Sequence, residues 1–284
     1  MNFQLTEEQQ LIEQSARDFA KEFLDPIAVQ LDNTGEFPKA VIAELANHDF
    51  LGLHLPAEAG GAGAGFVSYV AVIESLSRSS AAVTSIINNQ AMASYAIQTW
   101  GSDAQKKQYV RAFIKGEMIG AFAICENGPT TGIGPDALNA TKTEGGYVLK
   151  GTKAYVRNAG EAGVYVVFAV TDAADPNALT AFVVDASAAG LKVGPRLNTM
   201  GLKGCPVAHV VFDDVKVPET AVLGSLKAGR EIAARVLALA SVAEAAQTVG
   251  IGQAAVEHAA AYAKQRVQFG KPIATLQAIQ TLLA

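Results

Sequence analysis

The sequence has few cysteines and histidines, and its net charge is negative. Cys125 and Cys205 form no C-x-x-C pair, and the four histidines are scattered without the spacing of metal ligands. No metal site is predicted, and a reducing compartment is the default expectation. The net charge of −5 also argues against a nucleic-acid surface as the main function.

Long apolar runs are missing as well. No stretch of about 18 uninterrupted apolar residues occurs, so we expect no membrane-spanning segment and no integral membrane protein. The first 19 residues are acidic and amphipathic and lack the apolar core of a secretory signal, and no Arg- and Ser-rich transit peptide is visible. A soluble intracellular protein is therefore expected.

What the chain does have is a high apolar content, 50%, arranged in three successive patterns. The first part is helical and begins with a capping box at Thr6–Gln9. In the middle part, Gly, Thr and Val become frequent and period-two runs predict short strands. An Ala-dense helical pattern then returns. We predict an α+β fold with an N-terminal helical domain at 1–118, a central β-sandwich or barrel at 119–224, and an incomplete C-terminal helical bundle at 225–284.

Several local features allow more than one interpretation. The segment 146–156, GYVLKGTKAYV, resembles a β-hairpin. The Gly-rich segment 59–65 follows no convincing strand, so a helix-linking turn is favoured over a nucleotide loop. The second Gly-rich segment, 128–136, could present N–H groups to an anion without being a Rossmann turn. His54, like the other histidines of the helical runs, is expected to be a surface or packing residue.

Six segments together resemble one protein family. They are LTEEQQLIEQSARDFAKE, LPAEAGGAG followed by IESLSR, KGEMIGAFAICE, GYVLKGTKAYVRNAG, MGLKGCPVAHVVFDDVKVPETAVLG and YAKQRVQFGKPIATLQAIQ. In this order, and covering nearly the whole chain, they are similar to acyl-CoA dehydrogenases. The fold of that family, a helical domain, a β-domain and a four-helix bundle, agrees with the helix–strand–helix order of the periodicity.

The resemblance implies α,β-dehydrogenation of an acyl-CoA thioester with FAD as the cofactor. A glutamate removes the α-proton while a hydride passes from the β-carbon to the flavin, and hydrogen bonds to the thioester carbonyl stabilise the enolate. An electron-transfer flavoprotein as electron acceptor, a homodimer or homotetramer, and a place in the bacterial cytoplasm or mitochondrial matrix are also implied.

The resemblance further implies which residues contact FAD. The flavin loop of the family corresponds to 122–131, and Tyr155, Val156 and Arg157 take the place of its usual Trp-Ile-Thr. Arg266 matches an arginine that reaches the FAD pyrophosphate of the neighbouring subunit. The implied cofactor contacts are Phe122, Cys125, Glu126, Thr131, Tyr155, Val156, Arg157, Arg266, Phe269 and Gln277. Thr131 and Ser241 are the implied substrate contacts.

Four departures from the family pattern affect this site. Cys125 replaces a threonine, Gly132 replaces an aspartate, and the segment 238–241 replaces Asp-Gly-Gly-Arg with Ala-Leu-Ala-Ser. Arg157 replaces a threonine that meets flavin N5. A guanidinium there could stabilise anionic reduced flavin, or it could block the site.

The catalytic glutamate is missing from its expected places. In one subgroup of the family it would occupy Ala240, and in the commoner arrangement it lies beyond Ala284. Glu244 lies one turn from Ala240, on the same helical face, but the family geometry does not place a base there. We therefore expect that this chain alone does not catalyse dehydrogenation. Because 274–284 resembles the start of a third bundle helix, a fragment is favoured over a shortened paralogue.

Two other functions remain open. A flavin-dependent monooxygenase or oxidase of the same superfamily is compatible with Arg157 and with the loss of Asp-Gly-Gly-Arg. A non-catalytic binding or assembly paralogue is compatible with the altered flavin loop and the absent base.

Overall fold

The structure, a computed structural model, describes residues 4–126, 137–172, 174–175 and 178–284. Its first helix, α1 (Glu7–Phe19), begins at the predicted capping box. The Gln9 N–H donates to Thr6 Oγ1 at 3.3 Å, and the Thr6 N–H donates to Gln9 Oε1 at 2.9 Å. Two of the unpaired donors at this helix end are thereby satisfied.

The helical region continues through α2 (Ala28–Thr34), α3 (Lys39–Asn47), α4 (Gly65–Ser77), α5 (Ala81–Trp100), α6 (Asp103–Gln105) and α7 (Arg111–Ile114). Short π- and 3₁₀-helical turns join them: η1 (Ala20–Leu24), η2 (Phe50–Gly52), η3 (Ala57–Ala59) and η4 (Lys106–Val110). The Gly-rich segment 59–65 lies between η3 and α4, so the prediction of a helix-linking turn is confirmed.

The middle of the chain forms one eight-stranded mixed sheet. Its strands are β1 (Gly120–Ala123), β2 (Asn139–Thr143), β3 (Gly146–Arg157), β4 (Val164–Val170), β5 (Leu179–Asp185), β6 (Leu191–Arg196), β7 (Val207–Pro218) and β8 (Val222–Leu223), the last preceded by the turn η5 (Glu219–Ala221). Their order is β6-β7-β3-β2-β4-β5-β8, and β1 pairs in parallel with β4.

The predicted hairpin at 146–156 is wrong, because these residues belong to the single strand β3. That strand pairs with β2 on one side and β7 on the other. Gly151 has φ 142° and marks a register shift between Leu149 and Gly151. The turn of the real hairpin, at residues 144–145, lies earlier, between β2 and β3. A glycine inside a strand here allows a bulge, not a reversal of direction.

Strand β4 is buried on both faces. Val164, Val166 and Phe168 pack into a cluster with α5, α7 and the start of α8, whereas Tyr165 and Val167 pack into a second cluster inside the sheet. The alternation of period two in this strand therefore separates two apolar cores, and the all-apolar run VYVVFAV is explained.

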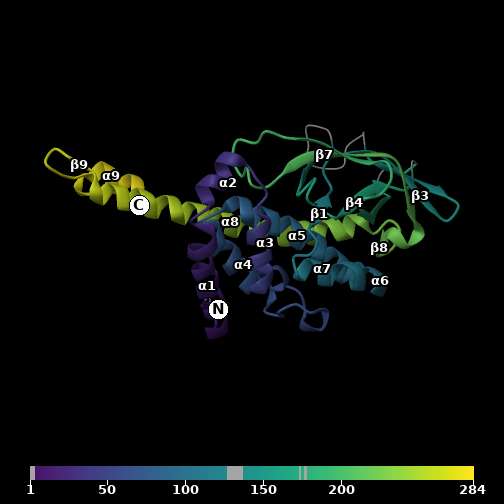
Figure 1. The fold of residues 1–284 in the computed structure, drawn as a ribbon, viewed down its shortest axis with the longest axis horizontal. Helices are drawn as coiled ribbons and strands as arrows, with labels where there is room; N and C mark the ends of the chain where they lie inside the picture. Colours follow the sequence, from purple (N-terminus) through teal and green to yellow (C-terminus); the bar gives the residue numbers. More distant parts are fainter. Residues whose placement is uncertain (1–3, 127–136, 173, 176–177) are drawn as a thin grey trace.

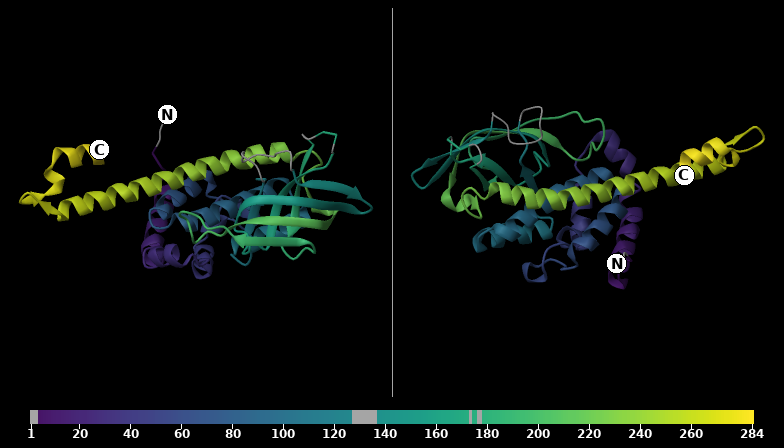
Figure 2. Two further views of the ribbon diagram at one scale, coloured as in Figure 1. Left: turned by 90° about the horizontal axis from the view of Figure 1, so that it is seen from above. Right: turned by 180° about the vertical axis from the view of Figure 1, so that it is seen from behind.

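The helix α8 (Gly229–Gln265) runs lengthways through the molecule (Figures 1 and 2). Its 37 residues correspond to about 55 Å at 1.5 Å per residue. Ile232 and Val236 pack in the cluster that contains β4, and Ala243 and Ala246 pack where α8 contacts α4 and α5. The helix therefore contacts both the sheet and the N-terminal helices.

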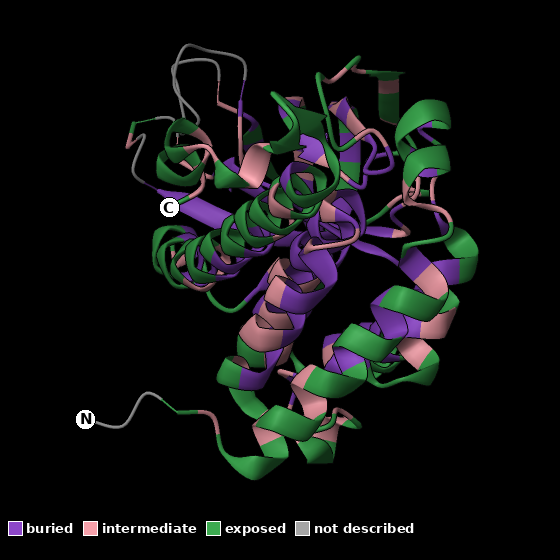
Figure 3. Cartoon of the chain, turned by 90° about the vertical axis from the view of Figure 1, so that its left-hand side faces the viewer, coloured by how far each residue is buried: buried purple, intermediate pink, exposed green. Residues whose placement is uncertain are grey.

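The C-terminal end of α8 extends beyond the rest of the molecule (Figures 1 and 2) and is largely exposed (Figure 3). It is followed by the hairpin β9 (Val267–Gln268) and β10 (Lys271–Pro272), the turn η6 (Ile273–Thr275) and α9 (Gln277–Leu283). By length and composition alone, α8 is long and apolar enough to cross a membrane. Of its most apolar 18 residues, 33% are buried, and core helices of soluble proteins pass the same test.

Candidate functional site

A bulge near the end of β3 displays Tyr155 on the surface. The pairing with β7 shifts register between Lys153 and Val156, and Tyr155 has φ 53°, which is rare for an aromatic residue. Its side chain is 58% exposed, and its ring centroid lies 5.4 Å from that of His209. His209 Nδ1 is buried without a hydrogen-bond partner among the described residues. Backbone strain of this kind is typical of functional sites.

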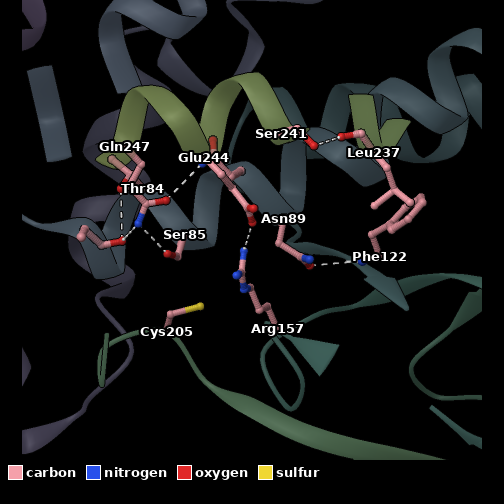
Figure 4. Close-up of polar contacts among 12 residues, drawn as sticks. Thr84, Ser85, Asn89, Phe122, Arg157, Cys205, Leu237, Ser241, Glu244 and Gln247 are labelled. Carbon is pink, nitrogen blue, oxygen red and sulfur yellow. Dashed lines mark hydrogen bonds and ion pairs between the residues drawn. The ribbon is translucent and has the colours of Figure 1, made fainter. Parts of the chain in front are cut away.

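Arg157 ends β3 and forms an ion pair with Glu244 on α8 (Figure 4). Arg157 Nη1 lies 2.7 Å from Glu244 Oε1, and the two side chains are 37% and 48% exposed. Glu244, which the sequence analysis considered only as a substitute base, is therefore paired with a cation. The pair joins the sheet to α8 at a largely exposed position, two residues along β3 from Tyr155. We call the surface formed by Tyr155, Arg157 and His209 the flavin flank, because the family resemblance implies flavin contacts for Tyr155 and Arg157.

Buried amides hold this end of β3 in place. Asn158, with φ 62°, donates through Nδ2 to the Ile86 carbonyl at 3.0 Å and to the Gly120 carbonyl at 3.1 Å. The thiol of Cys205 lies 3.9 Å from Asn158 Oδ1, and burial raises the pKa of Cys205 to about 11. The thiol is thus protonated and serves packing. Asn158 fixes the position of its neighbour Arg157 relative to α5 and β1.

Phe122 and Val156, predicted to contact the cofactor, have buried side chains. The Phe122 ring packs edge-on against Phe168 with centroids 5.0 Å apart, and the Phe122 N–H donates to Asn89 Oδ1 at 3.1 Å. Their side chains therefore belong to the apolar cores, Phe122 to the cluster with α5 and α8 and Val156 to the cluster inside the sheet. Cys125 is half-buried, and burial raises the pKa of its thiol against the opposing charges of Lys153 and Arg157.

Glu126 forms a buried ion pair that sequence reasoning missed. Its Oε1 lies 2.7 Å from Lys153 Nζ, and the side chains are 1% and 0% exposed, respectively. Glu126 also accepts the Leu138 N–H at 2.9 Å, and Lys153 Nζ donates to the Ile124 carbonyl at 3.3 Å. Burial lowers the pKa of Lys153, against the opposing effect of Glu126. No local signal distinguishes this lysine from the exposed lysines nearby.

Some predicted residues lie away from the flavin flank or outside the described residues. Thr131, Gly132 and the segment 128–136 belong to the latter group. Three others are exposed: Arg266 directly after α8, Phe269 in the turn between β9 and β10, and Gln277 at the start of α9. Glu244 and Arg266 are separated by 22 positions on or next to one helix, about 33 Å at 1.5 Å per residue. Within one chain, the structure therefore does not bring Arg266 close to Glu244 and the flavin flank.

A small cavity of about 20 Å³ lies between α4, α5 and α8. Its lining, mostly apolar, comprises His54, Phe66, Tyr69, Asn88, Ala91, Met92, Tyr95, Val236, Leu239, Ala240 and Ala243. Leu239 and Ala240 belong to the segment that replaces Asp-Gly-Gly-Arg. Ser241, the predicted substrate contact, is exposed and donates its hydroxyl proton to the Leu237 carbonyl at 2.8 Å. The described residues contain no cluster of three or more metal-ligating side chains.

The polar side chains between these helices form a chain of hydrogen bonds. Tyr69 Oη donates to Asn88 Oδ1 at 2.7 Å, and Asn88 Nδ2 donates to Gln247 Oε1 at 3.4 Å. Gln247 Nε2 donates in turn to Ser85 Oγ and to the Ala81 carbonyl, both at 2.9 Å (Figure 4). The network fixes α8 against α4 and α5 next to the cavity.

A helical region, a mixed sheet and a long helix that contacts both make up the fold, and a strained aromatic residue and a cation lie near the end of β3. Three parts of one family match in order: "Acyl-CoA dehydrogenase, N-terminal domain" over residues 6–117, "middle domain" over 121–215 and "C-terminal domain" over 227–284. The chain belongs to the acyl-CoA dehydrogenase family, whose cofactor is FAD, and it is an oxidoreductase of that family.

Known proteins resemble the chain over almost its whole length. It is 38% identical to the acyl-CoA dehydrogenase of Bacillus subtilis, covering 99% of this chain and 74% of the relative. It is 38% identical to the 3-(aryl)acrylate reductase of Clostridium sporogenes, covering 98% and 74%. Butyryl-CoA dehydrogenase from Megasphaera elsdenii has a TM-score of 0.95 at 33% identity, covering 100% and 76%. The expectation of this family and fold from the sequence is confirmed.

Proposed function

We propose that this chain carries the flavin and acyl sites of a dehydrogenase that acts on short acyl-CoA thioesters. The position of the cavity carries the proposal: Ala240 in its wall lies one turn of α8 from Glu244, which contacts Arg157 on the flavin flank. One turn is about 5.4 Å. An acyl tail in the cavity would therefore place its first carbons beside that flank. The small cavity and the likeness to a butyryl-CoA dehydrogenase support a short acyl group.

The residues of the flavin flank fit an FAD ring system. The exposed ring of Tyr155 offers a stacking face, Arg157 offers forked donors, and the unpaired His209 Nδ1 is a polar atom that a ligand could satisfy. FAD, when bound, supplies the hydride acceptor. We include Cys125 and Glu126 as supports beneath the ring, and Phe122 and Val156 as its apolar floor. We also propose that the chain divides into three domains, at residues 1–118, 119–224 and 225–284.

The far end of α8 supports a dimer in which each subunit completes its partner's cofactor site. Because about 33 Å separates Arg266 from Glu244, the Arg266 side chain cannot reach the flavin flank of its own chain. Arg266, Phe269 and Gln277 are exposed and free to meet a second copy. We therefore propose a homodimer, or a homotetramer built from such dimers, with Arg266 on the partner's FAD pyrophosphate.

None of the described residues that line the cavity can serve as a carboxylate base. The lining contains no carboxylate, Ala240 occupies one of the family's positions for the base, and Glu244 is paired with Arg157. We propose that this chain binds FAD and acyl-CoA but does not complete dehydrogenation alone. Where a base is present, electrons would pass to an electron-transfer flavoprotein.

A visible absorption spectrum of the purified chain, before and after FAD is added, tests this proposal. A flavin band that survives desalting is expected, and anaerobic butyryl-CoA should perturb the band without bleaching it. A colourless protein with a folded circular dichroism spectrum would contradict the flavin site and favour a non-catalytic binding paralogue. Rapid oxygen consumption by the photoreduced protein would instead favour an oxidase or monooxygenase, a reading that the Arg157 guanidinium on the flank keeps open.

A further inference from the structure

One polar atom at the cavity has no partner in this chain. His54 lies between η2 and η3 and lines the cavity, and its Nδ1 is buried without a hydrogen-bond partner among the described residues. Buried polar atoms in native proteins are almost always paired, so an orphan at a cavity points to a ligand or an ordered water.

The other ring nitrogen determines which tautomer is present. His54 Nε2 lies 3.2 Å from Ser94 Oγ, and the Ser94 hydroxyl donates its one proton to the Ala91 carbonyl at 3.1 Å. Ser94 Oγ must therefore accept from His54 Nε2–H, which leaves Nδ1 as a bare acceptor. Burial lowers the pKa of His54 to about 4, so the ring is neutral near pH 7.

The surroundings of Nδ1 favour a donor carried on a carbon chain over a free water. A buried water typically makes about three hydrogen bonds. Here Tyr69 gives its only hydroxyl proton to Asn88, Asn88 donates one of its two N–H protons to Gln247, and most of the lining is apolar. A hydroxyl on an acyl chain needs one acceptor, and its carbons match the apolar wall. A volume of about 20 Å³ suffices for one group of that size.

We propose that His54 Nδ1 selects acyl groups that carry a hydroxyl, or a similar O–H donor, at the end that enters the cavity. This inference rests on the proposed function, because it takes the cavity as the seat of the acyl tail. A plain acyl chain would bury Nδ1 unpaired, whereas a hydroxylated chain would satisfy it.

Calorimetric binding of matched ligands to the FAD-loaded chain tests the inference without requiring turnover. Butyryl-CoA and 4-hydroxybutyryl-CoA form one pair, and hexanoyl-CoA and 6-hydroxyhexanoyl-CoA form a longer pair. We expect the hydroxylated ligand of at least one pair to bind about tenfold more tightly. His54→Leu should abolish this preference, and His258→Leu, an exposed histidine outside the cavity, should retain it.

Further measurements distinguish a failure of this inference from a failure of the proposed function. Ser94→Ala should weaken the preference without removing the imidazole, which covers the case in which His54→Leu does not fold. In nitrogen-15 spectra, the His54 ring should show a proton on Nε2, and a proton on Nδ1 would overturn the inference. Equal binding within both pairs would also overturn it and leave the proposed function standing. If no acyl-CoA binds at all, the proposed function itself fails.

Discussion

Replacing Lys153 by methionine should destabilise this protein far more than the same change at Lys150, three positions earlier on β3. Lys153 Nζ lies 2.7 Å from Glu126 Oε1, and both side chains are essentially inaccessible to solvent. Methionine keeps most of the apolar stem but removes the cation. The Glu126 carboxylate would then stay buried with the Leu138 N–H among its donors but without its counter-ion.

The size of the effect follows from burial. Removing one partner of a buried ion pair typically costs about 3–5 kcal/mol, because the remaining charge keeps its desolvation penalty. Lys150 pairs with Asp214 at 3.1 Å, but these side chains are 68% and 61% exposed. An exposed pair contributes about 1 kcal/mol or less. The two variants should therefore differ by at least about 2 kcal/mol in the free energy of unfolding.

Urea unfolding followed by circular dichroism provides the comparison. Lys153→Met should unfold at a clearly lower urea concentration than Lys150→Met, and Lys153→Met combined with Glu126→Gln should recover part of the loss. The recovery is expected because a neutral amide oxygen can still accept the Leu138 N–H without a buried charge. If the two single variants cost the same, the reasoning from burial is refuted.

Three further predictions concern the site. The pKa of His54 falls from 6.5 to about 4 on folding, so the unfolded state takes up the proton first as the pH falls. Between pH 7 and pH 5, the free energy of unfolding should therefore fall by about 2 kcal/mol more in the wild type than in His54→Leu, as urea titrations would measure. Glu244→Gln should raise the reduction potential of bound FAD, measured by dye equilibration, because an uncompensated Arg157 favours anionic flavin; an unchanged potential would place Arg157 away from the ring. Arg266→Ala should increase FAD loss on desalting while the far-ultraviolet circular dichroism stays unchanged, and full retention would count against the partner clamp.

Much of the fold could be predicted from local sequence patterns, because those patterns reflect interactions between residues that are close in the chain. The capping box at Thr6 marked the start of α1, and the change from period 3.6 to period 2 marked the sheet. The hairpin error at 146–156 has the same origin. A glycine signals either a turn or a bulge, and only pairing with β2 and β7 on both sides of β3 decides between them.

The site was less predictable because its contacts join distant segments. Lys150 and Lys153 look alike in the sequence, yet a bulge before Lys153 and a partner 27 positions away make one exposed and the other buried. His54 is a lone histidine in the sequence. Its role depends on Ser94 of α5 and on a cavity that α8 closes, and no periodic pattern reports such contacts.

The ion pair between Arg157 and Glu244 bears on whether the altered site is still in use. Arg157 stands where the family usually has a threonine, and its carboxylate partner comes from α8, 87 positions later in the chain. A pair this exposed contributes at most about 1 kcal/mol, so stability alone gives little reason for it. Its physical effect is instead to fix the direction of a guanidinium two residues from the strained Tyr155 and to pair the Glu244 carboxylate, one helical turn from Ala240, with a cation. That arrangement favours a rearranged flavin site over one that has simply lost its polar groups.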